Sequence, residues 1–408
     1  MGSTAARAVG LVTMPVLTRL YSPQDFGLMS FFVSVTTVLG SILTLRYVVA
    51  LPIPKQEARA RALLLLNVIL VITLSLFLAG SLATLFVSPG REWVESRFDA
   101  FWLSNWWLIP IGAAGVAFYE ILSMWATRER SYSAISRSQL WQAVTGAGVK
   151  LVGGFTTPGP LALVSGQIIQ QSGGIFGLLS SFTAAIRRAL LGYRARHILS
   201  LSARYSDFPC YKLPSHFIYA LAAQAPILFS SYMWDTSTTG QLGLAFQAIA
   251  LPVALVSQNA SRVYYAELAA IGKSNPQAAL KLTYYMVARL FFIGLCACVG
   301  LLVLAPTLFQ LAFGSDWALS GELARALAIY IPAQFVASPL ITAYNIYGSQ
   351  RQALFLHTVR AALVCGVFIV CHLLNVGVVA TIYAYAVMIS LHYGLTCYRV
   401  IKAIGNDR

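Results

Sequence analysis

The sequence predicts an all-α membrane protein of about 12 transmembrane helices, and two observations support this class. Hydrophobic residues make up 58% of the 408 residues, and charged residues make up only 10%. Soluble domains are typically about 45–50% apolar and about 25% charged. The second observation is that apolar segments run along the whole chain. They leave no stretch long enough to form a soluble domain.

Twelve apolar segments are candidates for membrane spans, because a helix needs about 20 apolar residues to cross the hydrocarbon core. Backbone groups cannot stay unpaired in lipid, so each span should be an α-helix. We expect the first helix to be short or truncated. The predicted spans are 5–20, 27–51, 62–87, 102–125, 138–156, 159–184, 213–234, 239–261, 282–306, 324–348, 352–374 and 376–398.

The basic residues support this count and predict an orientation. If the N-terminus lies inside, both ends and the even-numbered connections hold 20 Lys and Arg residues, counting Arg7 near the start of the first span. The outer side holds only Arg91, Arg97 and Arg19, which lies at the end of the first span. Cytoplasmic connections are enriched in Lys and Arg. We therefore expect both termini in the cytoplasm. The net charge of +15 does not indicate nucleic acid, because the basic residues lie in short connections and form no single basic face.

The longest basic connection, residues 185–212, lies at the middle of the chain. It predicts an N-terminal six-helix bundle at 1–184, a cytoplasmic connecting loop at 185–212 and a C-terminal six-helix bundle at 213–408. The connection is interpreted as a solvated loop that enforces topology. The alternative is an amphipathic helix that lies on anionic lipid headgroups.

The two halves share a faint repeat. The first helix of each half contains a proline, Pro15 or Pro226, and a polar turn follows that ends at Gly27 or Gly240. Both copies run from inside to outside, so they would be parallel repeats. Chance similarity between apolar helices is the alternative. Because proline removes a backbone donor and kinks a helix, Pro15 and Pro226 are candidate hinges, with static kinks as the alternative.

No motif of enzyme or metal chemistry stands out in the sequence. It contains no GxxxxGK[ST] loop for nucleotide binding and no HExxH, and its six cysteines form no CxxC pair. No Ser-His-Asp set and no pair of carboxylates stands out either. We therefore predict a transporter with no catalytic residue, no bound metal and no cofactor.

Several segments resemble a known family. The stretch from Pro15 to Lys55 contains LTRLYSP, then DFG, then Leu45-Arg46-Tyr47. It is similar to the start of the polysaccharide flippases, the O-antigen and exopolysaccharide translocases of the MOP exporter superfamily. The segments from Phe208 to Pro226 and from Gly240 to Pro252 are also similar to that family, in the expected order. The resemblance covers essentially the whole chain.

This resemblance implies two six-helix bundles around a central cavity. It implies transport of a polyprenyl-diphosphate-linked oligosaccharide from the inner to the outer leaflet of the bacterial cytoplasmic (inner) membrane, for cell-surface polysaccharides such as lipopolysaccharide. It also implies alternating access, with possible coupling to a proton or sodium gradient. The expected partners are the lipid-linked oligosaccharide, membrane lipids and other polysaccharide-assembly proteins.

Charged residues inside spans are costly and usually face a polar cavity. Four basic candidates, Arg46, Lys150, Arg289 and Arg360, could bind the diphosphate, because Arg and Lys pair with phosphate oxygens. Snorkelling toward the interface is the alternative for the arginines. Glu120 could form an ion pair with an arginine or take up a coupling proton.

Polar residues in the spans are candidates to line a sugar-binding cavity, although hydrogen bonds between helices would also explain them. These residues are Gln224, Gln247, Gln258 and Asn259. Two other functions stay open. A multidrug or metabolite antiporter of the same superfamily would need acidic residues deep in the spans, and this chain offers basic ones. A membrane-embedded glycosyltransferase or polymerase would need a long outer loop or a carboxylate cluster.

Overall fold

The computed structural model describes residues 2–87, 92, 95, 99–190, 195–273, 275–347 and 350–406. These residues form helices and turns without a strand, which confirms the predicted all-α class. The chain divides into two compact units, Met1–Gln224 and Ala225–Arg408. The division falls inside α11 (Leu213–Met233), the helix that starts where the second half was predicted to start.

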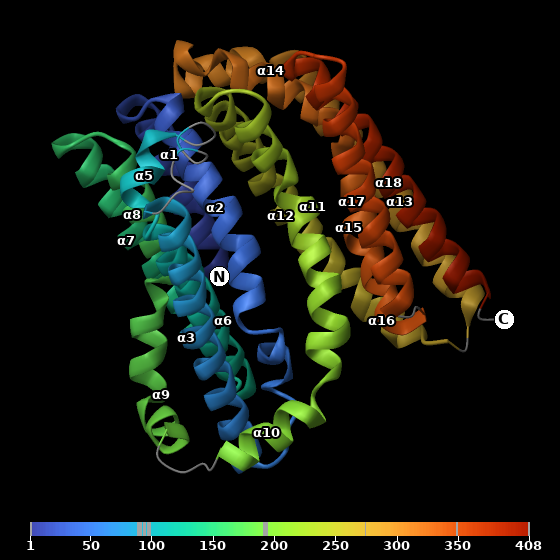
Figure 1. Ribbon diagram of the computed structural model, residues 1–408. Helices are drawn as coiled ribbons and strands as arrows, with labels where there is room; N and C mark the ends of the chain where they lie inside the picture. The colour runs from blue at the N-terminus through green and yellow to red at the C-terminus, as the bar shows by residue number, and fades with distance from the viewer. Residues whose placement is uncertain are drawn as a thin grey trace. The chain divides into compact units, whose positions relative to one another are not determined.

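The first unit contains long helices for the first six predicted spans (Figure 1). The fourth predicted span is broken into a short helix and a long one, and the sixth is broken at Gly173. The helices are α1 (Gly2–Leu20), α2 (Pro23–Leu43), α3 (Glu57–Val87), α5 (Ala100–Asn105), α6 (Leu108–Arg128), α7 (Tyr132–Thr156), α8 (Pro160–Ser172) and α9 (Gly174–Leu190).

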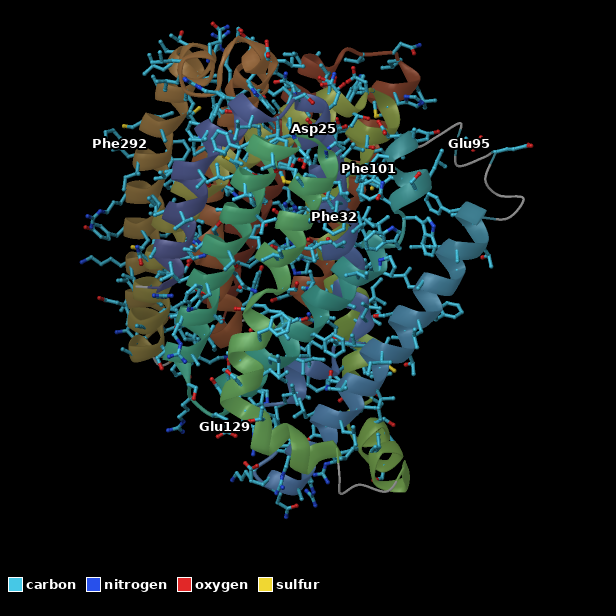
Figure 2. The ribbon with its side chains drawn as sticks, turned by 90° about the vertical axis from the view of Figure 1, so that its left-hand side faces the viewer. Asp25, Phe32, Glu95, Phe101, Glu129 and Phe292 are labelled. Carbon is cyan, nitrogen blue, oxygen red and sulfur yellow. The ribbon has the colours of Figure 1, made fainter. Side chains whose placement is uncertain are left out.

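The start of α2 is encoded locally. Ser22 caps the helix, because its side chain accepts a hydrogen bond from the Asp25 backbone N–H while the Asp25 carboxylate accepts one from the Ser22 backbone. Pro23 at the first helical position suits the helical φ. Asp25 and Glu129 lie at opposite ends of this unit in Figure 2. Its core gathers large apolar side chains such as Leu51, Leu63 and Trp125.

The second span ends earlier than predicted. We expected one helix to residue 51, but α2 ends at Leu43, and a 3-10 turn, η1 (Tyr47–Ala50), follows. Leu45 and Arg46 between them have φ of 44° and 60°. This left-handed conformation is unfavourable for residues with a Cβ, and it breaks the helix. Apolar composition predicted the span but carried no sign of this break.

The basic connection contains helical structure in its described part. α10 (Ala195–Arg204) and a π-helical turn, η2 (Phe208–Lys212), lie within residues 185–212. α10 packs beside α3, at the lower end of the first unit in Figure 1. Ile198, Tyr205 and Phe208 pack against the core of the unit, and the Tyr47 hydroxyl donates to the Ser202 carbonyl at 3.0 Å. The connection is therefore docked on the first unit.

The second unit is built on two long helices, α12 (Thr236–Ile271) and α13 (Pro276–Phe313), with the end of α11. The tenth predicted span is a chain of short helices: α14 (Ala318–Leu327), η4 (Ala328–Tyr330), α15 (Ile331–Leu340), η5 (Ile341–Ala343) and α16 (Tyr344–Tyr347). α17 (Gln350–Leu373) and α18 (Val378–Asn406) complete the unit, and they lie side by side in Figure 1.

Eight helical segments in the described part of the chain are long and apolar enough to cross a membrane. The four predicted spans outside this set are α1, α7, the pair α8 and α9, and α11. Two of them, α7 and α8, carry the polar residues Gln142, Lys150, Gln167 and Gln170. α7 packs against both α1 and α8, so these polar side chains have protein neighbours. The chain is a multi-pass membrane protein.

Candidate functional site

Arg46 and Glu120 form an ion pair inside the first unit. The Arg46 Nη1 lies 2.9 Å from the Glu120 Oε1, and both side chains are largely shielded, with 14% and 27% exposed. Arg46 reaches Glu120 from the left-handed turn after α2, whereas Glu120 projects from α6. A strained backbone of this kind costs about 1–3 kcal/mol and persists where surrounding structure enforces it. Glu120 therefore forms the ion pair with an arginine that was one of its two predicted roles. Its other predicted role, the uptake of a coupling proton, stays a prediction.

The Lys150 side chain is held by glutamine side chains, near the end of the first unit opposite to Arg46. Only 6% of the residue is exposed. Its Nζ donates to Gln167 Oε1 at 2.5 Å and to Gln170 Oε1 at 2.6 Å. The Tyr21 hydroxyl donates to the Lys150 carbonyl at 2.6 Å. Among the described residues, no carboxylate forms a salt bridge with this ammonium group, so neutral oxygens alone stabilise its charge.

Close helix packing encloses Lys150. A Cβ added at Gly166 would lie 2.5 Å from the Lys150 Cγ and 3.0 Å from the Gly146 carbonyl oxygen. A Cβ at Gly146 would lie 2.6 Å from the Gln170 Cβ and 2.9 Å from the Gln170 Cα. Glycine at these two positions lets α7 and α8 approach closely. The Lys150 ammonium is therefore buried in a helix contact.

The structure separates Arg46 from Lys150. Tyr21 immediately precedes α2 and contacts Lys150, whereas Arg46 follows the end of the same helix. A helix of 21 residues is about 30 Å long. The two basic side chains therefore lie near opposite ends of the first unit, and they cannot bind the same diphosphate in this conformation.

Arg360 lies in a cluster of aromatic side chains in the second unit. Its guanidinium carbon lies 5.9 Å from the ring centre of Tyr393, and its side chain hydrogen-bonds with Tyr385. The Tyr330 ring lies 6.4 Å from the Tyr385 ring and 6.5 Å from the Tyr393 ring, and these residues come from η4 and α18. The helices α15, α17 and α18 contain no acidic residue. Tyrosine hydroxyls and faces therefore surround this cation.

Two histidines belong to the same region, which we call the Arg360 cluster: Tyr330, His357, Arg360, Tyr385, His392 and Tyr393. His392 is 5% exposed, and its buried Nδ1 has no hydrogen-bond partner. The imidazole centre of His392 lies 5.9 Å from the ring centre of Tyr393, the same ring over which the Arg360 guanidinium lies. Sequence reasoning missed the tyrosines and His392. A signal existed, because residues 385, 392 and 393 are spaced to share one helix face.

Arg289 does not join any of these clusters. It is exposed on α13, and its Nη1 lies 3.4 Å from the Tyr285 hydroxyl oxygen. Its neighbours Phe291 and Phe292 are also exposed, and Phe292 points outward from the helix in Figure 2. An arginine among outward-facing aromatics matches the snorkelling interpretation.

The remaining candidates are spread over α1, α11 and α12. Gln224 Oε1 accepts a hydrogen bond from Ser34 Oγ at 3.0 Å, which links α11 to α2 within the first unit. Gln247 is half-buried on α12, whereas Gln258 and Asn259 are exposed there. Pro15 and Pro226 lie inside the helices α1 and α11. Among the described residues, no group of His, Cys, Asp or Glu side chains is arranged to hold a metal ion.

Comparison with known proteins decides the family. A family model described as "Polysaccharide biosynthesis protein" matches residues 16–321, three quarters of the chain. The chain belongs to this family. No curated protein sequence matches the chain. This family membership confirms the resemblance that the sequence motifs indicated.

Solved structures show the same fold. A lipid II flippase, MurJ, in an inward closed conformation is 13% identical, with a TM-score of 0.70, and the match covers 98% of this chain and 88% of that one. An inward-facing multidrug resistance MATE family transporter of the MOP superfamily is 12% identical, with a TM-score of 0.66 and coverage of 100% and 94%. At these identities the likeness establishes the fold, which flippases and transporters share.

Proposed function

We propose that this protein moves a polyprenyl-diphosphate-linked oligosaccharide from the inner to the outer leaflet of the bacterial cytoplasmic membrane. The observation that carries the proposal is Arg360, a cation within a bundle whose helices α15, α17 and α18 supply no acidic residue. A guanidinium pairs well with phosphate oxygens, so a diphosphate is a ligand suited to this residue. The polysaccharide biosynthesis family and the flippase fold support the same cargo class.

The direction of transport follows from the charge asymmetry of the connections. Basic residues concentrated on one side indicate that this side, with both termini, is cytoplasmic. Cytoplasmic enzymes would then load the donor lipid from the basic side. Alternating access, with bending at Pro15 and Pro226, would release it on the other side, and a proton or sodium gradient could drive the cycle. Assembly proteins for O-antigen or exopolysaccharide would act on the released cargo.

A second candidate function is drug or metabolite export, which the likeness to a multidrug transporter favours. Organic cations would need a negative site inside the bundles. The only acidic residue that we predict inside a span is Glu120, and Arg46 neutralises it at 2.9 Å. An anionic cargo fits the buried charges better than a cationic one.

Complementation of a flippase-deficient strain tests the proposal. Arg360→Gln removes the positive charge and should reduce surface polysaccharide at least about tenfold, the change that a lost charge-assisted contact of about 1.4 kcal/mol produces. The matched control is Arg399→Gln, because Arg399 also lies over an aromatic ring, Phe355, but is exposed near the end of α18. The control should behave as wild type. Full activity of Arg360→Gln at equal protein level would contradict the proposal.

A further inference from the structure

The second unit contains a buried histidine near the half-buried Arg360, at the middle of two adjacent helices. His392 is the fifteenth of the 29 residues of α18, and Arg360 is the eleventh of the 24 residues of α17. The Nδ1 of His392 is buried without a hydrogen-bond partner. A buried polar atom left unpaired destabilises the folded state. In native proteins such atoms are few, and a role in function is one reason to retain them.

The groups around His392 determine which charge state it can hold. From α17 come Arg360 and His357, from η4 comes Tyr330, and α18 itself adds Tyr385 and Tyr393. No carboxylate belongs to this set in the described part of the chain. A second positive charge next to Arg360 in a buried site is unfavourable. An anion bound at Arg360 would reverse this, because it would attract a proton to the imidazole.

We propose that His392 takes up a proton when a diphosphate binds at Arg360, so that the Arg360 cluster binds the anion and a proton together. This inference rests on the proposed function and deepens it by assigning a coupling residue. Protonation adds a donor to the imidazole and a second positive charge next to the guanidinium. Tyr385 and Tyr393 hold Arg360 in place, and their hydroxyls offer further donors. Loss of the anion would make the proton leave again.

The linkage has a defined sign. Protonated His392 attracts the anion, so affinity for a diphosphate is highest at low pH and falls as pH rises through the titration of His392. Thermodynamic reciprocity requires that anion binding then causes net proton uptake from the solvent. Couplings of this kind are typically about 5–150-fold in affinity. We expect the dissociation constant for the diphosphate to be about tenfold lower at pH 5.5 than at pH 8.

The test uses the purified full chain in nanodiscs and a polyprenyl diphosphate diester carrying one N-acetylglucosamine as the probe. The diester keeps both phosphate charges over this pH range, so any pH dependence belongs to the protein. His392→Gln should bind with a dissociation constant that changes less than about twofold between the two pH values, and it should take up fewer protons on binding. His372→Gln is the control, because His372 is exposed in the last turn of α17 and outside the Arg360 cluster, and it should keep the pH dependence of wild type.

Other outcomes separate this inference from the proposed function. An unchanged pH dependence and proton uptake in a folded His392→Gln protein would overturn the role of His392 but leave the flippase proposal intact. No binding of the diester by wild type at either pH would overturn both. A water-soluble nucleotide-sugar diphosphate serves as a second arm. If the nucleotide-sugar diphosphate bound as tightly as the polyprenyl diester, the site would recognise a free diphosphate and not the lipid-linked one. His392→Gln keeps a hydrogen-bonding group but cannot take up a proton, whereas His392→Phe lacks both properties. Proton uptake on binding must therefore be reduced in both variants.

Discussion

Two cations within predicted spans, the buried Lys150 in the first unit and the half-buried Arg360 in the second, are held in different ways. Lys150 is enclosed by two glutamine oxygens and by glycines that let α7 and α8 meet. Arg360 is surrounded by tyrosines and lies beside a histidine whose Nδ1 lacks a partner. The first arrangement satisfies its charge with neutral oxygens and packing. The second leaves polar atoms that an anion and a proton could satisfy.

From this difference we expect Lys150 to stabilise the helix contact, and we propose Arg360 as the residue that binds the ligand. The difference matters because both residues have the same sequence signature, a basic side chain within an apolar span. Only the neighbours separate them. The following three predictions challenge this division, and they are ordered by the size of the expected effect.

The largest expected effect is a loss of stability at the Lys150 helix contact. Gly166→Ala would place a Cβ 2.5 Å from the Lys150 Cγ and close to backbone atoms of α7. Overpacking of this kind costs about 1–3 kcal/mol of unfolding free energy. The matched control is Gly148→Ala on α7, where a Cβ would meet nothing within 4 Å. Denaturation of the detergent-solubilised full chain measures both. Equal stability of the two variants would mean that the contact around Lys150 is loose.

A smaller effect is expected at the Arg46–Glu120 pair. Glu120→Gln leaves Arg46 without its carboxylate and should lower the unfolding free energy by about 1–2 kcal/mol, because both side chains are partly exposed. Arg46→Gln alone should cost a similar amount. The double variant should recover part of the loss, because it leaves no uncompensated charge. A double-variant loss equal to the sum of the single losses would show that the two residues do not interact.

The smallest effects compare two tyrosine hydroxyls. Tyr21→Phe removes the hydrogen bond to the Lys150 carbonyl and should cost about 1 kcal/mol of stability with unchanged affinity for the diphosphate diester. Tyr385→Phe removes the hydroxyl next to Arg360 and should weaken that affinity about threefold with little change in stability. Parallel thermal unfolding and binding experiments measure both quantities. If Tyr21→Phe weakened binding and Tyr385→Phe did not, the division of roles would be reversed.

Sequence patterns predicted the helical class because apolar length is a local property. They also pointed to Arg46, Lys150 and Arg360, since a charge in an apolar span is visible without a structure. The break after Leu43 was not predictable, because Leu45 and Arg46 adopt left-handed backbone although neither is a glycine, asparagine or aspartate, the residue types that signal this conformation in a sequence. The Arg360 cluster was also missed. Its members come from η4, α17 and α18, and only the fold brings these segments together.

The most direct test of the central claim is leaflet transfer in proteoliposomes. The purified chain is reconstituted with a fluorescent polyprenyl-diphosphate oligosaccharide, and an impermeant quencher reports how much lipid changes leaflet. We predict transfer well above that of protein-free liposomes, and its loss in Arg360→Gln but not in Arg399→Gln. No transfer by a folded wild-type protein under an imposed proton or sodium gradient would contradict the claim, as would transport of an organic cation in its place.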